Sequence, residues 1–591
     1  MKKHYETHVE DTDKLISVAG PVLDYKSWYE QYRKLMEEQA QRKYGLYTPT
    51  SEGDDDDFPS ITGMIARYSA LGLTNEQMAE NPVWKDLTGN GHDLQMKNFA
   101  WGGMSGVGGY KLNWGDSSIW VSYIAGGTYG TGEVTDNTIH ITSAKTNNAL
   151  FEARASLKSV EYKVLIKGLT DDIYLRYGVF NDGKELWTEI KNDGIYTLPS
   201  YDYDSRYNMK WKVMSQTYPI DCNITIEQLP LYPGALVFDG VDDYGVCDNF
   251  PILTKEKGYT VVALRQRIST GEGIRGLVSN VKNWFKDGAF ILEYSYTKNS
   301  YFNRPVSFGA IGGEKDLPHI LTYQTSKSYN GVSIAVGSFI GTDQLYVGKI
   351  DNIIGNCTNA AIWELVFLDH DATEEELTKI KDYFVKTYPW LFPDQAWTVT
   401  GKTNEDEDRA TIANITGNGN DLVLSNFGFA EGSGYNEQGE YAGYLVTDGV
   451  DDKIASSDFK IDKDFTIVGD WKFIIDENKG CGLVKVPKLF IYNSKTGLDI
   501  YINSNSIKNI LSGIKGLNAV CSDGRVYDCN WNEISVKYGN MVDINSSFLI
   551  ANSGNIFTKM AFKNLGIYNN QLLSKDDCIK AYNYLQTLKA K

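Results

Sequence analysis

The chain has 591 residues, more than one hydrophobic core accommodates, and at roughly 150 residues per domain we expect three or four domains. Hydrophobic residues make up 42% of the chain and charged residues 23%, a composition that excludes disordered and fibrous-repeat proteins. The formal net charge of −18, with no basic run, would repel a phosphate backbone, so we expect no nucleic-acid binding.

Residues 1–60 predict an N-terminal helical anchor followed by an acidic linker with four consecutive aspartates at 54–57. From Asp24 to about Arg42, large apolar side chains recur at helical spacing: Tyr25, Trp28, Tyr29, Tyr32, Leu35 and Met36. This stripe either packs on a neighbouring domain of the chain or docks on another protein, and both interpretations stay open. We choose the second as the working prediction.

The same N-terminal segment predicts where the protein is made. Charged residues follow Lys2 and Lys3 where a secretory signal needs an apolar stretch, so we expect no signal peptide. No stretch of the chain approaches the roughly 18 consecutive apolar residues of a membrane span, so we expect no membrane insertion. Seven scattered cysteines without metal-ligand spacing are typical of free thiols in a reducing cytoplasm.

An internal repeat organises the rest of the chain. The stretch DLTGNGHDLQMKNF at 86–99 matches NITGNGNDLVLSNF at 414–427 at eight of 14 positions. A second block, FDGVDDYGVC from Phe238, matches TDGVDDKIAS from Thr447. We expect glycine and asparagine in both blocks to form tight hairpin turns, and the strands that follow to bury one face.

The spacing of the blocks predicts an insertion, because the first copy holds about 119 more residues between them than the second. Residues 111–232 alternate strand-like runs with Gly, Asn and Asp turns, which predicts an inserted β-sandwich domain. The first module then covers 61–390 in two pieces, 61–110 and 233–390, and the second covers 391–591. Each ends in a predicted helix with capping-box spacing, at Thr373 and Glu376 and at Ser574 and Asp577.

The repeated aspartates are the only candidate metal ligands. Each DGVDD block clusters three carboxylates, which could bind Ca²⁺ if backbone carbonyls completed the shell: Asp239, Asp242 and Asp243, and Asp448, Asp451 and Asp452. Aspartates that form turns explain the same pattern, and we expect no cofactor beyond this possible Ca²⁺.

Catalytic residues are not predicted. The six histidines show no metal-binding spacing outside the terminal pair His4 and His8, and no nucleophile or phosphate-loop motif occurs. A retaining glucanase would carry a pattern such as ExDxxE on one strand, and the two ExD matches, Glu52 with Asp54 and Glu314 with Asp316, do not complete it. A catalytic pair from distant segments stays open as an alternative.

The TGNGxDL block, the DGVDD turn, the strand FTIVGDWKF and the closing helix together resemble concanavalin A-like, laminin-G-like jelly-roll domains. With a signal-less, helical N-terminus, the chain also resembles fibre or appendage proteins of tailed phages that infect Bacteroides, including the crAss-like group. The resemblance implies a mostly β fold, with two concanavalin A-like jelly-roll sandwiches, the first interrupted by the inserted β-sandwich. It also implies carbohydrate or receptor binding, and no catalytic residues transfer with it.

The resulting prediction is a virion-associated fibre or decoration protein, made in the host cytoplasm. Its N-terminal segment contacts other virion proteins, its modules contact a host surface glycan or receptor, and it is expected to be a homo-oligomer. A polysaccharide depolymerase and a purely structural virion protein without ligand are the alternatives.

Overall fold

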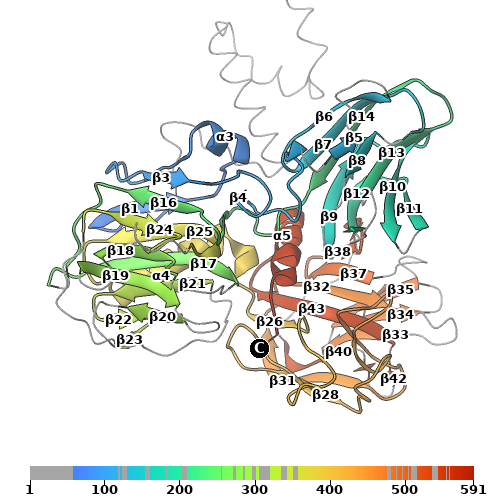
Figure 1. Ribbon diagram of the computed structural model, residues 1–591. Coiled ribbons are helices and arrows are strands. Elements are labelled where there is room, and N and C mark those ends of the chain that lie inside the picture. The colour runs from blue at the N-terminus through green and yellow to red at the C-terminus, as the bar shows by residue number, and fades with distance from the viewer. Residues whose placement is uncertain are drawn as a thin grey trace, which may run out of the picture. The chain divides into compact units, whose positions relative to one another are not determined.

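A computed structural model describes residues 57–590 except 118–119, 123–128, 149, 154–159, 182–183, 201–208, 255, 270–274, 284–286, 296–300, 305–319, 334–341, 351–356, 475–480, 487–488, 495–496, 503–504, 508–515, 536–543, 551, 554–555 and 558. The described chain is mostly β, as the sequence predicts (Figure 1). Its strands form antiparallel sheets, and helices are few. Within this part of the chain, no helix has the length and apolar character that crossing a bilayer requires.

Two sheets from 64–107 and 236–368 pack against each other through one buried cluster that includes Trp84, Leu94, Phe238 and Phe367. The first has the strand order β23 (Val332–Ser333), β22 (Ser328–Tyr329), β21 (Leu321–Thr325), β17 (Thr260–Ser269), β25 (Asn359–Leu368), β15 (Leu236–Asp239) and β4 (Gly106–Val107), with β1 (Met64–Ser69) also paired to β25. The second has β2 (Val83–Trp84), β3 (Leu94–Lys97), β16 (Tyr244–Cys247), β24 (Leu345–Val347), β18 (Val278–Asn283), β19 (Asp287–Ser295) and β20 (Tyr301–Arg304).

Two further sheets from 395–569 share a separate cluster that includes Trp397, Phe465, Trp471 and Phe562. One has the order β29 (Gly434–Asn436), β30 (Tyr444–Val446), β43 (Met560–Asn569), β32 (Phe465–Phe473), β37 (Gly516–Cys521), β38 (Arg525–Asp528) and β39 (Glu533–Ser535), with β26 (Gln395–Thr398) also paired to β43. The other has β27 (Thr411–Ile412), β28 (Leu422–Ser425), β31 (Lys453–Ile461), β40 (Ile544–Ile550), β33 (Cys481–Val486), β34 (Leu489–Ser494), β35 (Gly497–Ile502) and β36 (Asn505–Ile507). A separate two-stranded sheet, β41 (Asn552–Ser553) and β42 (Ile556–Phe557), contacts β33.

The two pairs of sheets have the same strand order. The order β4, β15, β25, β17, β21 corresponds to β29, β30, β43, β32, β37, and β2, β3, β16, β24 corresponds to β27, β28, β31, β40. The repeated blocks also have the same surroundings. The Asn90 side chain donates to the Ile65 carbonyl at 2.8 Å, and the Asn418 side chain donates to the Asp394 carbonyl at 2.8 Å.

Between the two pieces of the first repeat lie two five-stranded sheets. Their orders are β11 (Lys184–Ile190), β10 (Ile173–Asn181), β13 (Met209–Ser215), β8 (Phe151–Ala153), β5 (Trp120–Ser122), and β12 (Gly194–Ser200), β9 (Val160–Lys167), β14 (Ile220–Gln228), β7 (Thr138–Ala144), β6 (Gly130–Val134). All the buried residues of their shared core come from the stretch between Leu112 and Ile226. The four-part division of the chain, with its boundaries, stays a prediction that this core supports.

Each repeat ends in a helix that packs on its large sheet. Helix α4 (Glu374–Thr387) is capped by Thr373 and α5 (Lys575–Gln586) by Ser574, the two positions that capping-box spacing predicts. A short helix α3 (Asn75–Glu80) and a 3₁₀ turn η4 (Pro389–Leu391) complete the described helices. The expectation that module strands bury one face is wrong for β32. Ile467 points into the sheet-to-sheet core, whereas Val468 on the other face packs in a cluster with α5 residues.

The expected tight hairpins are also wrong in part. Gly89 and Gly91 have positive φ angles of 78° and 83°, but they lie in a long loop between the paired strands β2 and β3. The DGVDD block is not a hairpin, because it joins β15 in one sheet to β16 in the facing sheet. Crossing between packed sheets requires a sharp change of direction, and Gly240, with a φ of 79°, provides it.

Candidate functional site

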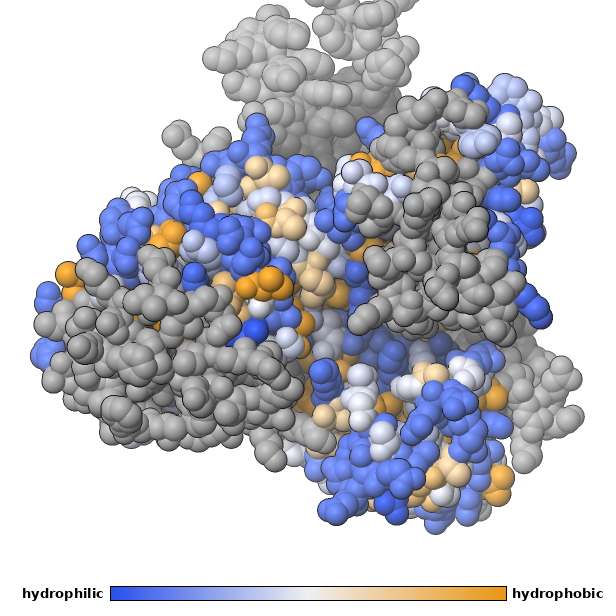
Figure 2. All heavy atoms as spheres, viewed as in Figure 1, coloured by the Kyte–Doolittle hydropathy of each residue, from blue (hydrophilic) through white to orange (hydrophobic). Residues whose placement is uncertain are grey.

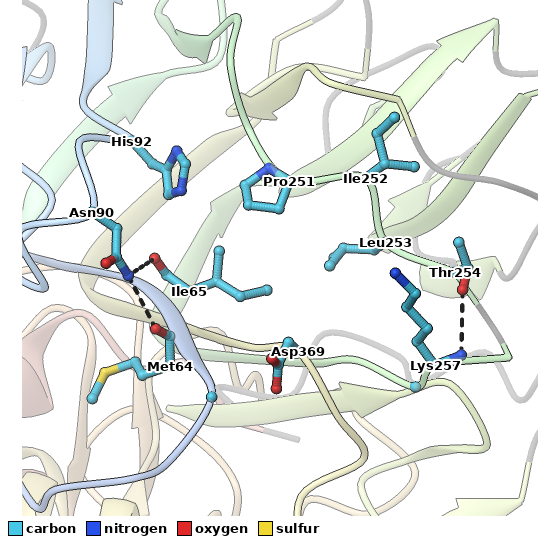
Figure 3. A pocket seen from close by; sticks show the side chains of 12 residues that line it. Met64, Ile65, Asn90, His92, Pro251, Ile252, Leu253, Thr254, Lys257 and Asp369 are labelled. Atoms are coloured by element: carbon cyan, nitrogen blue, oxygen red, sulfur yellow. Dashed lines mark hydrogen bonds between the residues drawn. The ribbon is translucent and has the colours of Figure 1, made fainter.

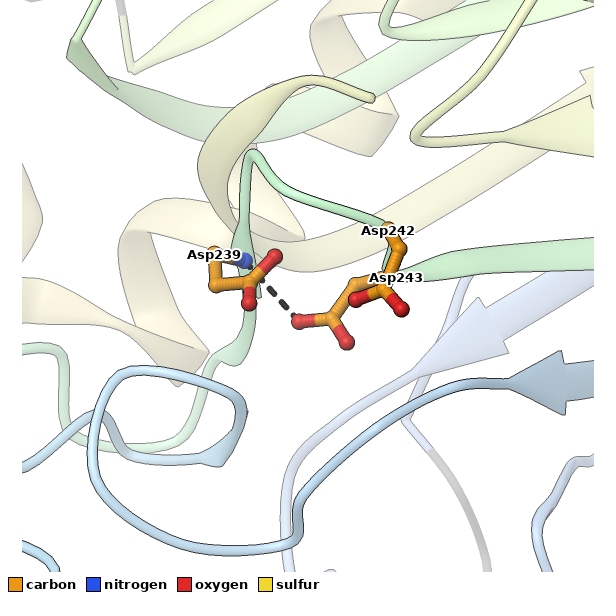
Figure 4. A group of neighbouring side chains, drawn as sticks. All are labelled: Asp239, Asp242 and Asp243. Carbon is orange, nitrogen blue, oxygen red and sulfur yellow. Dashed lines mark hydrogen bonds between the residues drawn. The ribbon is translucent and has the colours of Figure 1, made fainter. Parts of the chain in front are cut away.

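The aspartates of the first DGVDD block surround the crossing turn, and an oxygen of each lies within 4.8 Å of the others (Figure 4). Asp243 is fully buried and accepts hydrogen bonds from the Asp239 backbone N–H at 2.9 Å and from the Ser105 hydroxyl at 3.0 Å. Asp239 in turn accepts from the Val241 N–H at 2.7 Å. Asp242 is exposed.

The second DGVDD block repeats these bonds. Asp452 accepts from the Asp448 N–H at 2.7 Å and from the Ser433 hydroxyl at 3.0 Å, and Asp448 accepts from the Val450 N–H at 2.7 Å. Burial raises the pKa of Asp243 to about 7 and that of Asp452 to about 6. The hydrogen bonds account for both clusters as turn-forming aspartates, and Ca²⁺ binding stays a prediction.

The predicted docking residues Tyr25, Trp28, Tyr29, Tyr32, Leu35 and Met36 lie outside the described residues. Six cysteines in the described part of the chain are free thiols, in agreement with the sequence: Cys222, Cys247, Cys357, Cys521, Cys529 and Cys578.

A pocket of about 360 Å³ opens beside the first TGNG loop (Figure 3). Strand β1 supplies Ile65, and the loop after β16 supplies Pro251, Ile252 and Leu253, which together give the pocket apolar walls. The Ile252 side chain is 54% exposed, a large fraction for an isoleucine. The volume of the pocket lies in the range of small-molecule sites.

Polar side chains surround these apolar walls. His92 and Asn90 approach from the TGNG loop, and Thr254 and Lys257 from the opposite side in Figure 3. Asp369 follows β25 and adds a carboxylate. The pocket therefore offers an ammonium, an imidazole, a hydroxyl, an amide and a carboxylate around an apolar centre.

The TGNG loop is held in place by one side chain. Asp86 accepts hydrogen bonds from the backbone N–H groups of Arg67, Thr88 and His92, at 3.2, 3.0 and 3.1 Å. This network fixes the loop against β1, and Asn90 adds its bond to the Ile65 carbonyl. The pocket wall formed by Asn90 and His92 is therefore set before any ligand arrives.

The pocket does not hold the carboxylate pair of a glycosidase. Among the described residues that line it, Asp369 is the single carboxylate, whereas hydrolysis by the common mechanism requires two. Sequence reasoning missed this pocket, because its walls come from segments near 64, 90, 252 and 369 that no motif joins. The apolar run Pro251–Ile252–Leu253 before a strand is the one local signal that could have indicated it.

No family model matches the chain, and no curated protein matches it. Among solved structures, Trypanosoma rangeli sialidase aligns at 9% identity and a TM-score of 0.23, over 77% of this chain and 83% of that one. The botulinum neurotoxin serotype D binding domain aligns at 10% identity and a TM-score of 0.22, over 58% of this chain and 90% of that one. At these TM-scores the similarities carry no argument about fold or function.

Proposed function

We propose that the protein is a glycan-binding adhesion component of a phage virion, and that it binds without hydrolysing. The observation that supports binding is the pocket beside β1, with apolar walls and mixed polar groups. A sugar ring has an apolar face and hydroxyls at its edge, so it needs both kinds of contact. Lys257 and Thr254 can donate hydrogen bonds to hydroxyl oxygens, and Asp369 can accept from hydroxyl protons.

The binding proposal is tested with the full chain on an array of bacterial capsular and O-antigen polysaccharides. Ile252→Ser and Lys257→Gln should each weaken binding to the polysaccharide that the unmodified protein captures, by about tenfold. Both side chains are exposed, so the folded structure should persist. Val450→Ser is the matched control for Ile252→Ser, because Val450 is also exposed, at 65%, but lies in the second repeat.

If both pocket variants bound the polysaccharide as tightly as the unmodified protein, the glycan would bind outside this pocket. Binding to no polysaccharide at all would favour the purely structural alternative. Release of reducing ends from capsule preparations would favour the depolymerase, and the lone carboxylate of the pocket argues against that outcome there.

The virion part of the proposal rests on the sequence resemblance and on the predicted N-terminal anchor. Deletion of residues 1–60 should leave a folded protein that no longer enters particles. Mass spectrometry of purified virions measures both the presence of the chain and its copy number. Incorporation of the shortened chain at the normal copy number would contradict the anchoring role.

A further inference from the structure

A second surface with binding chemistry lies on the five-stranded sheet that contains β11, β10 and β13, which Figure 1 shows side by side. Leu175, Tyr177 and Val179 of β10 point into the core, so the alternate residues Arg176 and Gly178 face outward. On β13, Trp211 and Val213 point into the core, and the residues next to them, Lys210 and Lys212, face outward.

Trp187 of β11 lies flat on this outer face. It is paired with Gly178 across the strands, and a Cβ added at Gly178 would lie 2.6 Å from the indole ring. The missing side chain at Gly178 therefore lets the ring rest on the backbone of β10. The indole N–H donates to Glu185 at 3.3 Å, which fixes the ring in its plane. A flat, partly exposed indole on a rigid strand is a surface on which a sugar ring can stack.

Cations surround this ring. The Lys212 ammonium lies 4.6 Å from the ring centroid, and the Arg176 guanidinium carbon lies 5.8 Å from it. Arg176 is balanced by Glu189 at 3.5 Å, and Lys210 pairs with Glu185. Lys212 forms no salt bridge within the described part of the chain. Its positive charge is thus the one at this ring that an external anion can neutralise.

We propose that this face binds an anionic polysaccharide, with one sugar ring stacked on Trp187 and its carboxylate paired with Lys212. Because a net charge of −18 repels a polyanion, binding needs a local cation without an internal salt-bridge partner, and among the described residues Lys212 supplies one beside the ring. The site is separate from the β1 pocket, and neither needs the other.

The probe is polygalacturonate, a uronic-acid polymer, measured by calorimetry or affinity electrophoresis with the full chain. Its fully methyl-esterified form keeps the sugar rings and loses the charge. Trp187→Ala should weaken binding by about tenfold or more, as expected for the loss of one stacked ring. Lys212→Gln should weaken it and reduce its dependence on salt, since one charge contact is lost.

Gly178→Ala is the sharpest variant, because it keeps every ring and charge and only pushes the indole off the strand. It should weaken binding nearly as much as Trp187→Ala. Leu186→Asn is the matched control, since Leu186 neighbours Trp187 on β11, is 46% exposed, and points to the opposite side of the strand. Its binding should be unchanged.

Three results would overturn the proposal. Unchanged binding by Trp187→Ala and Gly178→Ala would exclude the stacking site. Equal binding of the methyl ester would exclude the anionic class. Equal binding of single-stranded DNA or polyaspartate, neither of which carries pyranose rings, would show simple ion exchange. Lys257→Gln, which changes the β1 pocket, should bind polygalacturonate normally. The experiment can therefore refute the Trp187 site without refuting the β1 pocket, and the reverse.

Discussion

At the scale of single residues, the two repeats hold the equivalent TGNG loop with different side chains, an aspartate in the first repeat and an asparagine in the second. Asp86 and Asn414 hold the same loop, and each accepts hydrogen bonds through Oδ1 from the backbone and hydroxyl of a threonine two residues on. The other polar atom of each side chain differs, because Asp86 has a second oxygen where Asn414 has an NH₂ group. The second oxygen of Asp86 accepts from the His92 N–H at 3.1 Å, whereas the Asn414 NH₂ group donates to the Gly419 carbonyl at 2.5 Å.

This difference predicts that the two side chains are not interchangeable. Asp86→Asn should place an NH₂ group against the His92 N–H, and Asn414→Asp should place a carboxylate against the Gly419 carbonyl. Each change should lower the free energy of unfolding by about 1–3 kcal/mol, the usual cost of mismatching a buried polar group. Thermal and urea unfolding of the two variants measure this, and an unchanged midpoint for either would show that the loop rearranges freely.

Asp243 gives a prediction about pH. Its folded-state pKa of about 7 lies above the ordinary value of 3.8, so the folded protein binds this proton more tightly than the unfolded chain does. The resulting stabilisation is fully present below pH about 4 and is lost as the pH rises to about 7. Asp243→Asn should remove this loss, because a neutral amide can still accept from the Asp239 N–H and donate to Ser105.

Unfolding midpoints at pH 4.5 and pH 8 test this. The variant should gain on the unmodified protein at pH 8 and match it more closely at pH 4.5. Asp242→Asn, exposed in the same turn, is the control and should show no such gain. Repeating the pH 8 measurement with CaCl₂ and with a chelator tests the metal prediction, since bound Ca²⁺ would stabilise the unmodified protein and not Asp243→Asn.

At the scale of elements, the sequence predicts what is local. The helix starts at Thr373 and Ser574 are confirmed, because a capping side chain bonds to a backbone N–H only three residues away. The course of the DGVDD block could not be predicted from local sequence, since it depends on β16 pairing in the facing sheet and not beside β15. The second buried face of β32 was missed for a related reason: Val468 is covered by α5, which lies more than 100 residues later in the chain.

The caps also give a quantitative prediction. Thr373→Ala removes the acceptor for the Glu376 N–H at 3.2 Å and should lower the free energy of unfolding by about 1 kcal/mol. Thr373→Ser keeps the hydroxyl and should lose little. Helix α4 packs on the large sheet through Ile380 and Phe384, so the loss should appear in global unfolding followed by tryptophan fluorescence. A change confined to helix fraying would contradict that coupling.

At the scale of the whole molecule, the repeated order of the sheets follows from the repeated sequence blocks, and the pocket does not. The pocket is made by segments from four places that only the finished fold brings together. The stretch between the two pieces of the first repeat has a core of its own, and its ends are close. The Leu231 N–H donates to the Gly109 carbonyl and the Tyr232 N–H to the Gly108 carbonyl, both at 2.8 Å.

These adjacent ends predict that the stretch can be removed. Replacing residues 111–230 with a short glycine linker should leave the rest folded, because closing so short a gap costs little entropy. The excised piece should also fold alone, although it loses contacts with the rest of the chain such as that of Lys163 with the Tyr582 ring. Circular dichroism and thermal unfolding of both pieces test this, and a molten remainder would show that the cores are interdependent.

The same pair of hydrogen bonds has a consequence for evolution. Because the inserted stretch begins and ends at neighbouring positions, recombination can replace it with a domain of another length without changing the packing of the first repeat. Exchange of this stretch would replace the surface of β11, β10 and β13, and with it the binding proposed there, while the sheets of the first repeat kept their packing.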